Sequence, residues 1–172
     1  MPVSRRRIGT VANRHGTTPL TTIACTRNEM AADSCFTFDD IGIGTGQASS
    51  KKLHRIGKSL FGERGDNCTG VSIALDWIRR GSKWKDRPEM PEDASFNLLE
   101  LNPQGIFLWS AALDRDLITE PNFAIGSGAK VALYCMRYRG MSPVKAVEEA
   151  SKVDAFTKGP YLVERINLRK KD

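Results

Sequence analysis

The pattern of apolar and polar positions changes abruptly at Thr21. Residues 1–20 have no hydrophobic periodicity and mix Arg, Gly, Thr, Asn and Pro, a composition typical of a disordered leader. Residues 21–26 are β-branched or small and apolar, which favours a strand, and residues 29–33 predict a strand that returns after a turn. We expect a loop over residues 39–50, which are rich in glycine and poor in large apolar side chains.

The middle of the chain predicts a second strand pair followed by a helix. Residues 52–56 and 59–61 favour strands joined at Gly57 and Lys58, and residues 62–66 predict a sharp turn. Within residues 67–81, apolar side chains recur at helical spacing and predict a helix that ends at Gly81. These side chains are Val71, Ala74, Leu75 and Ile78, and Ile73 and Trp77 widen the apolar face of the helix. Residues 82–94 are charged, contain two prolines and predict a loop.

The second half of the chain predicts a hairpin, a strand, two helices and a last strand. Residues 96–101 and 106–110 alternate as two strands around Asn-Pro-Gln-Gly, and residues 122–125 predict a short buried strand. One helix is expected from the Gly-Ser-Gly at 126–128 to Arg139, and another from Pro143 after a Ser142 cap. The expected buried stripe of the helix that starts at Pro143 is Val144, Val147, Ala150 and Val153. Residues 161–166 predict a last strand.

This order of elements indicates an α+β layered domain rather than a doubly wound sheet. The 172 residues, 40% hydrophobic and 27% charged, suit a single domain with its own core. No apolar run approaches the ~20 residues that span a bilayer, and the N-terminus lacks a secretory signal, so we expect a cytoplasmic protein.

Cysteine and charge usage change this picture little. The chain has four cysteines, Cys25, Cys35, Cys68 and Cys135, and none of them form a CxxC pair. We therefore expect neither a metal site nor a cofactor. The net charge is +6, of which the first twenty residues supply +4 through four arginines and no acid. Basic tails can hold nucleic acid, but no tryptophan interleaves with them as a stacking platform, so we do not expect a nucleic-acid partner.

Six segments, in order, resemble proteasome β subunits and the HslV-type peptidases. They are Thr-Thr-Ile-Ala at 21–24, Met-Ala-Ala-Asp-Ser at 30–34, Lys-Lys-Leu-His-Arg-Ile at 51–56, Glu-Arg-Gly-Asp at 63–66, Ala-Ile-Gly-Ser-Gly at 124–128 and Val-Asp-Ala-Phe-Thr-Lys-Gly-Pro at 153–160. The resemblance covers about residues 21–166. It implies the N-terminal nucleophile (Ntn) hydrolase fold, a four-layer αββα sandwich of two antiparallel sheets. One helix is expected to be reduced or missing, since residues 67–81 provide one helix where the family has two, and such compact relatives resemble those of phages and prophages.

The resemblance also implies a catalytic site. In this family the N-terminal threonine attacks an amide carbonyl, and its own α-amine, with a pKa of about 7.7–8.0, is the general base. Carried over by motif, Thr21 is the nucleophile, Lys52 lies beside its hydroxyl, and Asp33 is the counter-charge of Lys52. Gly65 would offer its N–H to the oxyanion. The α-amine of Thr21 and its water would be oriented by three further residues, Ser127, Asp154 and Thr157.

Two features of that site leave alternatives open. Strand alternation allows only one of Lys51 and Lys52 to face inward, and spacing favours Lys52. Thr21 follows Leu20 where family precursors usually have glycine, so residues 1–20 are a leader, a propeptide or a misassigned start, and residues 21–172 are the domain. The amine would be freed by self-cleavage before Thr21, or by initiation at position 20, where Leu20 would be a misread start codon, followed by removal of the initiator Met. A third route, cleavage between Gly16 and Thr17, ranks lowest because Pro19 interrupts the strand.

These observations favour one function and keep a second. The first is a threonine peptidase acting on peptides or proteins in a ring-like homo-oligomer, with a separate ATP-dependent unfoldase as a further partner that the resemblance suggests. The second is a catalytically inactive structural or assembly protein with the Ntn fold. The leader, the missing helix and Lys158, where the family often has glycine, favour the second.

Overall fold

A computed structural model describes residues 21–38, 41–44, 52–65 and 68–168. The helices of this part are α1 (Cys68–Arg79), the short 3-10 helix η2 (Trp84–Asp86), α2 (Ala129–Arg139) and α3 (Pro143–Ser151). The strands are β1 (Thr22–Thr26), β2 (Glu29–Ala32), β3 (Cys35–Phe38), β4 (Ile41–Gly44), β5 (Leu53–Ile56), β6 (Ser59–Gly65), β7 (Phe96–Asn102), β8 (Gly105–Ser110), β9 (Arg115–Ile118), β10 (Asn122–Gly126) and β11 (Leu162–Arg165).

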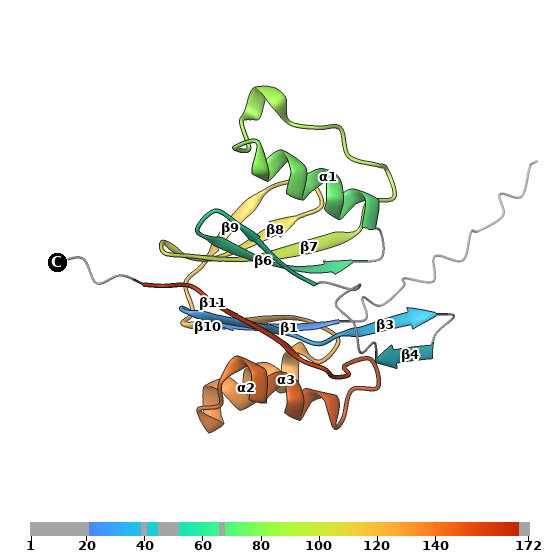
Figure 1. Ribbon diagram of the computed structural model, residues 1–172, viewed down its shortest axis with the longest axis vertical. Helices are drawn as coiled ribbons and strands as arrows, with labels where there is room; N and C mark the ends of the chain where they lie inside the picture. The colour runs from blue at the N-terminus through green and yellow to red at the C-terminus, as the bar shows by residue number, and fades with distance from the viewer. Residues whose placement is uncertain (1–20, 39–40, 45–51, 66–67, 169–172) are drawn as a thin grey trace, which may run out of the picture.

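These elements form four layers (Figure 1). A four-stranded antiparallel sheet, in the order β10-β1-β2-β11, lies against a five-stranded antiparallel sheet, in the order β5-β6-β7-β8-β9. Helix α1 covers the outer face of the five-stranded sheet, and α2 and α3 cover that of the four-stranded sheet (Figure 1). The arrangement confirms the predicted α+β sandwich of two antiparallel sheets.

Apolar side chains fill the three interfaces between the layers. Ile23 and Met30 of the four-stranded sheet meet Leu60 and Leu99 of the five-stranded sheet, and none of these side chains is exposed. Beneath the four-stranded sheet, small residues such as Ala24 let α2 and α3 pack closely. Strand β1 therefore lies in the middle of the molecule, and this fixes the position of Thr21, the residue that precedes it.

Gly62 shows why the turn predicted over residues 62–66 is wrong. Strand β6 runs on to Gly65, and residue 66 lies outside the described residues. A Cβ on Gly62 would lie 2.7 Å from Cγ2 of Ile23 in the opposite sheet. The glycine therefore serves close packing between the sheets rather than a turn.

Three other expectations need correction. Within the predicted loop 39–50, residues 41–44 form β4, which pairs with β3; residues 39–40 and 45–50 lie outside the described part. The alternation of isoleucine and glycine in β4 has the period of a strand, which its glycine content obscured. Strand β9 was not predicted, because its Arg-Asp-Leu-Ile sequence is largely exposed at the sheet edge. Val153 does not belong to the buried stripe of α3, which ends at Ser151, and is 73% exposed.

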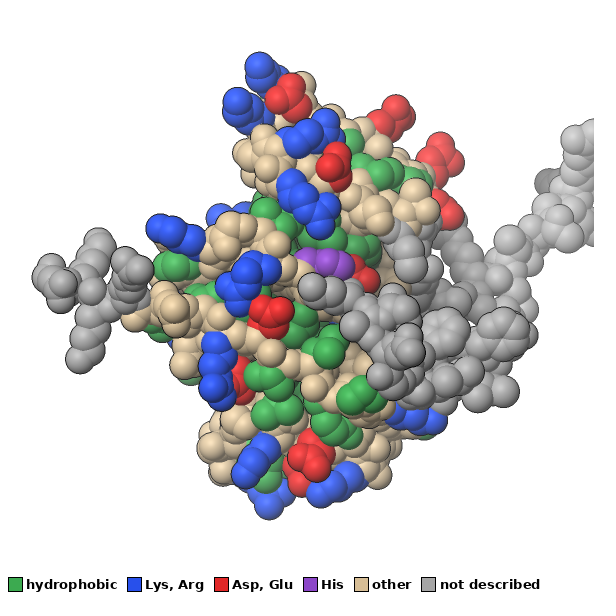
Figure 2. All heavy atoms as spheres, in the orientation of Figure 1, with side chains coloured by type: hydrophobic (Ala, Val, Ile, Leu, Met, Phe, Trp, Pro, Cys, Tyr) green, Lys and Arg blue, Asp and Glu red, His purple; other side chains and the backbone are tan. Residues whose placement is uncertain are grey.

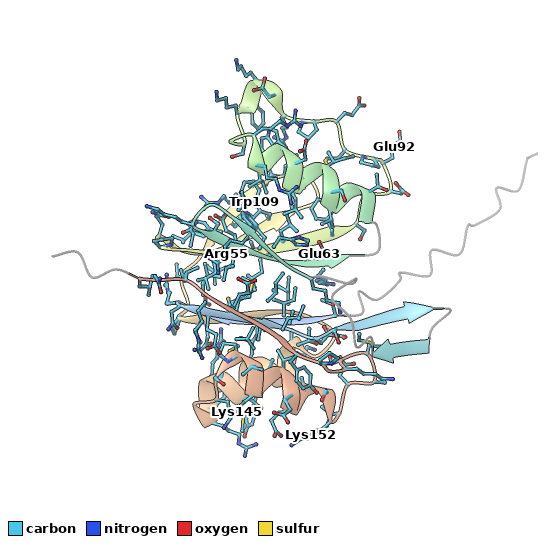
Figure 3. The ribbon with its side chains drawn as sticks, viewed as in Figure 1. Arg55, Glu63, Glu92, Trp109, Lys145 and Lys152 are labelled. Atoms are coloured by element: carbon cyan, nitrogen blue, oxygen red, sulfur yellow. The ribbon has the colours of Figure 1, made fainter. Side chains whose placement is uncertain are left out.

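The outer face of the five-stranded sheet carries a single α-helix among the described residues between β6 and β7. Helix α1 packs Trp77 against Trp109 of β8, which points toward the helix (Figure 3), and the remaining connection contains only η2. Within the described residues, this agrees with the prediction of one reduced or missing helix. No helix in the described part is long and apolar enough to cross a membrane.

Beyond α1, the same face holds a buried carboxylate. Glu100 of β7 is 4% exposed and accepts hydrogen bonds from four side chains: Ser59, Asn102, Trp109 and Arg115. Burial alone would raise the pKa of Glu100, but hydrogen bonds from Arg115, Trp109 and Asn102 outweigh it and lower the pKa.

Candidate active site

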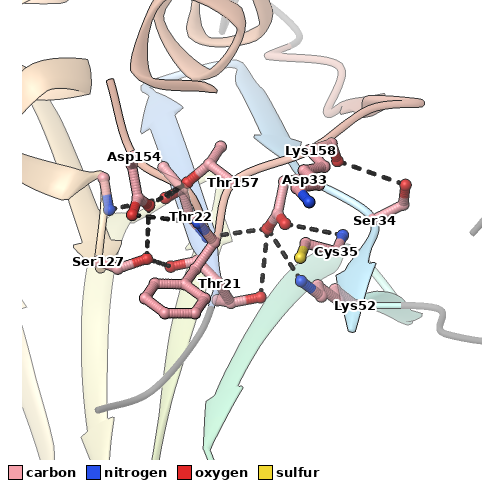
Figure 4. A network of polar contacts seen from close by, with 12 residues as sticks. Thr21, Thr22, Asp33, Ser34, Cys35, Lys52, Ser127, Asp154, Thr157 and Lys158 are labelled. Atoms are coloured by element: carbon pink, nitrogen blue, oxygen red, sulfur yellow. Dashed lines mark hydrogen bonds and ion pairs between the residues drawn. The ribbon is translucent and has the colours of Figure 1, made fainter. Parts of the chain in front are cut away.

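The carboxylate of Asp33 is the centre of the polar network in Figure 4. Asp33 follows β2 and is fully buried. Its Oδ1 accepts hydrogen bonds from the Thr21 hydroxyl at 3.2 Å and from the Thr22 amide at 2.8 Å. Its Oδ2 accepts one from the Cys35 amide at 2.8 Å. These bonds fix the carboxylate against the start of β1, because the pairing of β1 with β2 brings the two open ends of the hairpin together.

Lys52 supplies the positive charge. Its Nζ lies 2.9 Å from Oδ1 of Asp33, and the lysine side chain is only 10% exposed. The Thr21 hydroxyl and the Lys52 ammonium therefore bind the same carboxylate oxygen. A buried ammonium is tolerated when a carboxylate compensates it, and Asp33 does so here. Lys51, the rival of Lys52 in the sequence, lies outside the described residues.

The backbone of Thr21 is held from the opposite side of β1. Its carbonyl oxygen accepts a hydrogen bond from the Ser127 amide at 2.9 Å and a longer one, 3.4 Å, from the Ser127 hydroxyl. The carbonyl approaches Gly126 so closely that a Cβ there would lie 1.7 Å from the oxygen. Gly126 also has φ +106°, which disfavours other residues. The Gly-Ser-Gly segment thus positions the backbone of Thr21 besides preceding α2.

Ser127 continues into a second set of hydroxyl groups. Its hydroxyl donates to Oδ2 of Asp154 at 2.6 Å, and the Thr157 hydroxyl donates to the same oxygen. Thr157 is also 2.6 Å from the Thr22 hydroxyl, which accepts a hydrogen bond from the Gly128 amide at 2.9 Å. The turn after α3 is therefore tied to β1 and to the start of α2.

The structure joins six of the seven residues expected at the site into this network: Thr21, Asp33, Lys52, Ser127, Asp154 and Thr157. Gly65 stands outside the hydrogen bonds of the network. It ends β6 opposite Phe96, and a Cβ on it would lie 2.5 Å from the Phe96 Cβ. The catalytic roles of all seven residues stay predictions.

Sequence reasoning missed three participants. Thr22 bridges the two halves of the site through its hydroxyl, Gly126 makes room for the Thr21 carbonyl, and the Cys35 amide holds Asp33. Thr22 and Gly126 both lie within segments that carried the family resemblance. Their neighbours Thr21 and Ser127 were predicted because a hydroxyl nucleophile and a helix start have recognisable sequence patterns. A glycine that only prevents a steric clash has no such pattern.

The thiol nearest the site is poorly suited to be a nucleophile. Burial raises the pKa of Cys35, and the Asp33 carboxylate raises it further, against a smaller opposite effect of Lys52. Only a thiolate is strongly nucleophilic, so Cys35 stays in its unreactive form at neutral pH. A hydroxyl beside a paired ammonium is then the candidate nucleophile of this cluster.

Comparisons with known proteins place the fold. No family model and no curated protein matches the sequence. Among solved structures, Thiobacillus denitrificans BPH has a TM-score of 0.58 and 18% identity over 88% of this chain and 99% of its own. The same protein in complex with epoxomicin has a TM-score of 0.58 and 17% identity over 87% and 99%. Eukaryotic HslV from Trypanosoma brucei has a TM-score of 0.64 and 19% identity over 84% and 98%.

These likenesses define the class of architecture. The chain has the Ntn-hydrolase fold of HslV- and proteasome-like proteins, and nearly the whole length of each neighbour is matched. Within that fold, the neighbour that it resembles at the highest of these TM-scores is the trypanosomal HslV.

Proposed function

We propose that the protein is a threonine peptidase in which Thr21, with a free α-amine, hydrolyses amide bonds. The observation that carries the proposal is the shared contact of the Thr21 hydroxyl and the Lys52 ammonium with one oxygen of Asp33. The likeness to HslV, and to a protein whose complex with epoxomicin is known, supports the same class of chemistry.

The proposed reaction starts with attack of the Thr21 oxygen on the substrate carbonyl carbon, while the α-amine takes the hydroxyl proton. The Lys52 ammonium stabilises the developing charge on the Thr21 oxygen, and the Gly65 N–H is our candidate donor to the substrate oxyanion. The C–N bond then breaks, and the leaving amine receives the proton from the α-amine. Water, deprotonated by the same amine, hydrolyses the resulting ester and restores the Thr21 hydroxyl.

Removal of the segment before Thr21 is the condition for this reaction, because an acylated nitrogen cannot act as the base. Self-cleavage before Thr21 satisfies the condition, and so does initiation at position 20 once the initiator Met has been removed. Cleavage after Gly16 does not place the amine on Thr21, whose hydroxyl is the one that binds Asp33 in the described network. We therefore rank the first two routes above the third.

A peptide epoxyketone tests the proposal, because its ketone accepts the threonine hydroxyl and its epoxide carbon accepts the α-amine of the same residue. Nothing leaves, so the protein mass rises by the whole mass of the reagent. Protein expressed from the full coding sequence should show a chain that begins at Thr21 by intact mass, and this chain should react. Thr21→Ala should abolish the reaction, whereas Thr26→Ala, at the far, half-buried end of β1, should keep it.

The competing function is an inactive assembly protein with the same fold. It predicts a chain that keeps residues 1–20, no reaction with the epoxyketone, and an oligomer by light scattering. We propose that the active form is also a ring-like homo-oligomer, supported by the likeness to HslV, and that a separate unfoldase supplies protein substrates. On the face in Figure 2, basic and acidic side chains of the described residues are interspersed, which does not favour a nucleic-acid partner.

A further inference from the structure

An open depression lies on the outer face of the five-stranded sheet, next to the last turn of α1 and to Trp109 (Figure 3). Its volume is about 330 Å³. The five-stranded sheet separates it from β1 and from the proposed nucleophile. Its apolar lining includes Ile56, Phe61 and Ile78, and its polar lining includes Ser82, Glu100 and Arg115.

The carboxylate of Glu100 in this depression has no capacity left to accept hydrogen bonds. Its Oε1 accepts from Ser59 at 2.9 Å and from Asn102 at 2.6 Å. Its Oε2 accepts from Trp109 and from Arg115, both at 2.8 Å. A carboxylate oxygen offers about two acceptor sites, so both oxygens are saturated. A ligand in the depression must therefore bind to other polar groups.

Arg115 offers donors that are already held in place. Its Nε donates to Glu100, and its guanidinium carbon lies 3.5 Å from the centre of the Phe107 ring and 5.6 Å from that of the Trp109 ring. These contacts restrict the guanidinium plane, while its two Nη atoms have no hydrogen-bond acceptor among the described residues. The paired N–H groups of a planar, preorganised cation match the two oxygens of a carboxylate.

We propose that the depression binds a small organic acid, with its carboxylate on the Nη atoms of Arg115 and its apolar group against Ile56 and Ile78. The volume of the depression equals that of roughly eleven water molecules, enough for one ring or a short alkyl chain beside a carboxylate. A cationic ligand is disfavoured, because the charge of Glu100 is compensated by Arg115. The simpler role of this network, a set of contacts that only joins β7, β8 and β9, gives no preference for an anion.

Two probes of the same shape test the preference: para-fluorinated phenylpropionate and para-fluorinated phenylpropionamide. Broadening of the fluorine NMR signal of each probe, on titration with the full-length protein, gives its dissociation constant in any oligomeric state. We expect about 1–5 mM for the propionate and a value at least fivefold higher for the amide. Arg115→Gln should remove this difference. Arg55→Gln should preserve it, since Arg55 pairs with Glu164 away from the depression.

Ser82 allows a second test that leaves the contacts of Glu100 intact. It lines the depression and has φ +47°, a conformation that Asp and Asn adopt more readily than most residues. Ser82→Asp adds a negative charge there, and Ser82→Asn adds a neutral side chain of the same shape. We expect the propionate to bind at least fivefold more weakly to Ser82→Asp than to Ser82→Asn, because like charges repel, and the amide to bind equally to both.

Each outcome decides the inference. Equal dissociation constants of the two probes for wild-type protein overturn it, as does propionate binding that is the same in Ser82→Asp and Ser82→Asn. No broadening of either signal also overturns it. The wild-type comparison and the Ser82 pair decide the question even when Arg115→Gln fails to fold. None of these measurements uses the Thr21 amine, so the inference and the proposed peptidase function fail or stand separately.

Discussion

Replacing Asp33 by asparagine tests whether its charge holds the site together. Asparagine keeps the shape of the side chain but removes the negative charge and exchanges one acceptor oxygen for an NH₂ donor. Asp33 accepts hydrogen bonds from the Thr21 hydroxyl, from Lys52 and from two backbone amides, through both of its oxygens. Whichever way the asparagine amide is oriented, an NH₂ group faces a backbone N–H.

The expected loss follows from the burial of Lys52. An unpaired buried N–H costs about 1–3 kcal/mol, and a buried charge that loses its partner costs about 3–5 kcal/mol. The two effects overlap, so we expect the free energy of unfolding to fall by about 3–5 kcal/mol. Domains are commonly stable by only about 5–15 kcal/mol, so this loss is a large part of the total.

Urea denaturation followed by tryptophan fluorescence measures the loss. With an m-value of about 2 kcal/mol per molar urea, the midpoint should fall by about 1.5–2.5 M at equal protein concentration. Adding Lys52→Met to Asp33→Asn should recover part of the stability, because it removes the uncompensated charge and keeps most of the volume. The exposed control Asp116→Asn should change the free energy by no more than about 0.5 kcal/mol.

Two results would refute this reasoning. One is a midpoint for Asp33→Asn within about 0.5 M of wild type, equivalent to about 1 kcal/mol. The other is a double variant no more stable than Asp33→Asn, which would mean that the ammonium of Lys52 is compensated by another group. Neither result depends on catalysis, so the test addresses the geometry of the site by itself.

Two further predictions concern backbone packing and pH. Gly126→Ala should cost more than about 4 kcal/mol in urea denaturation, because its Cβ would collide with a backbone carbonyl, whereas Gly140→Ala, also at positive φ but with open space around it, should cost about 1–2 kcal/mol. Glu100→Gln should cost about 1–3 kcal/mol at neutral pH. Despite burial, hydrogen bonds lower the pKa of Glu100, so the folded state prefers the carboxylate. The advantage of wild type should be complete above the ordinary glutamate pKa of about 4.3 and disappear as the pH falls through the lower folded value, as measured by thermal unfolding across this range.

The contrary outcomes are equally definite. Similar losses for the alanine variants of Gly126 and Gly140 would show that the close approach of the Thr21 carbonyl is not a constraint. A stability difference between wild type and Glu100→Gln that stays constant down to about pH 3 would show that the carboxylate is not the form the fold prefers.

Local patterns in the sequence were sufficient for the parts of the site that lie on one hairpin. The β-branched start at Thr21 and the return toward Asp33 predicted that these residues are close. Strand alternation allowed only one of Lys51 and Lys52 to face inward, and spacing favoured Lys52. The hairpin at residues 96–110 and the helices around Gly128 and Pro143 were equally visible, because capping and turn chemistry depend on neighbours in the sequence.

Contacts between layers could not be predicted in this way. Gly62 has the sequence signature of a turn, and its reason for being glycine is Ile23 in the facing sheet. Gly126 is adapted in the same manner to the carbonyl of Thr21. The pairing of Glu63 with His54 needs the register of two strands, which the sequence leaves open. The residue type at each of these positions is determined by contacts with residues far apart in the chain. A single sequence does not show which residues face each other.

The attachment of Thr21 to the segments at 126–128 and 154–157 has a consequence for biosynthesis. During translation the first strands leave the ribosome well before Ser127, Asp154 and Thr157 do. Until Ser127 emerges, the Thr21 carbonyl lacks the groups that hold it, and until Thr157 emerges, the Thr22 hydroxyl lacks its partner in the last turn. A growing chain therefore cannot fix the conformation of Thr21 and Thr22, and the proposed site is complete only once nearly all of the polypeptide has been made.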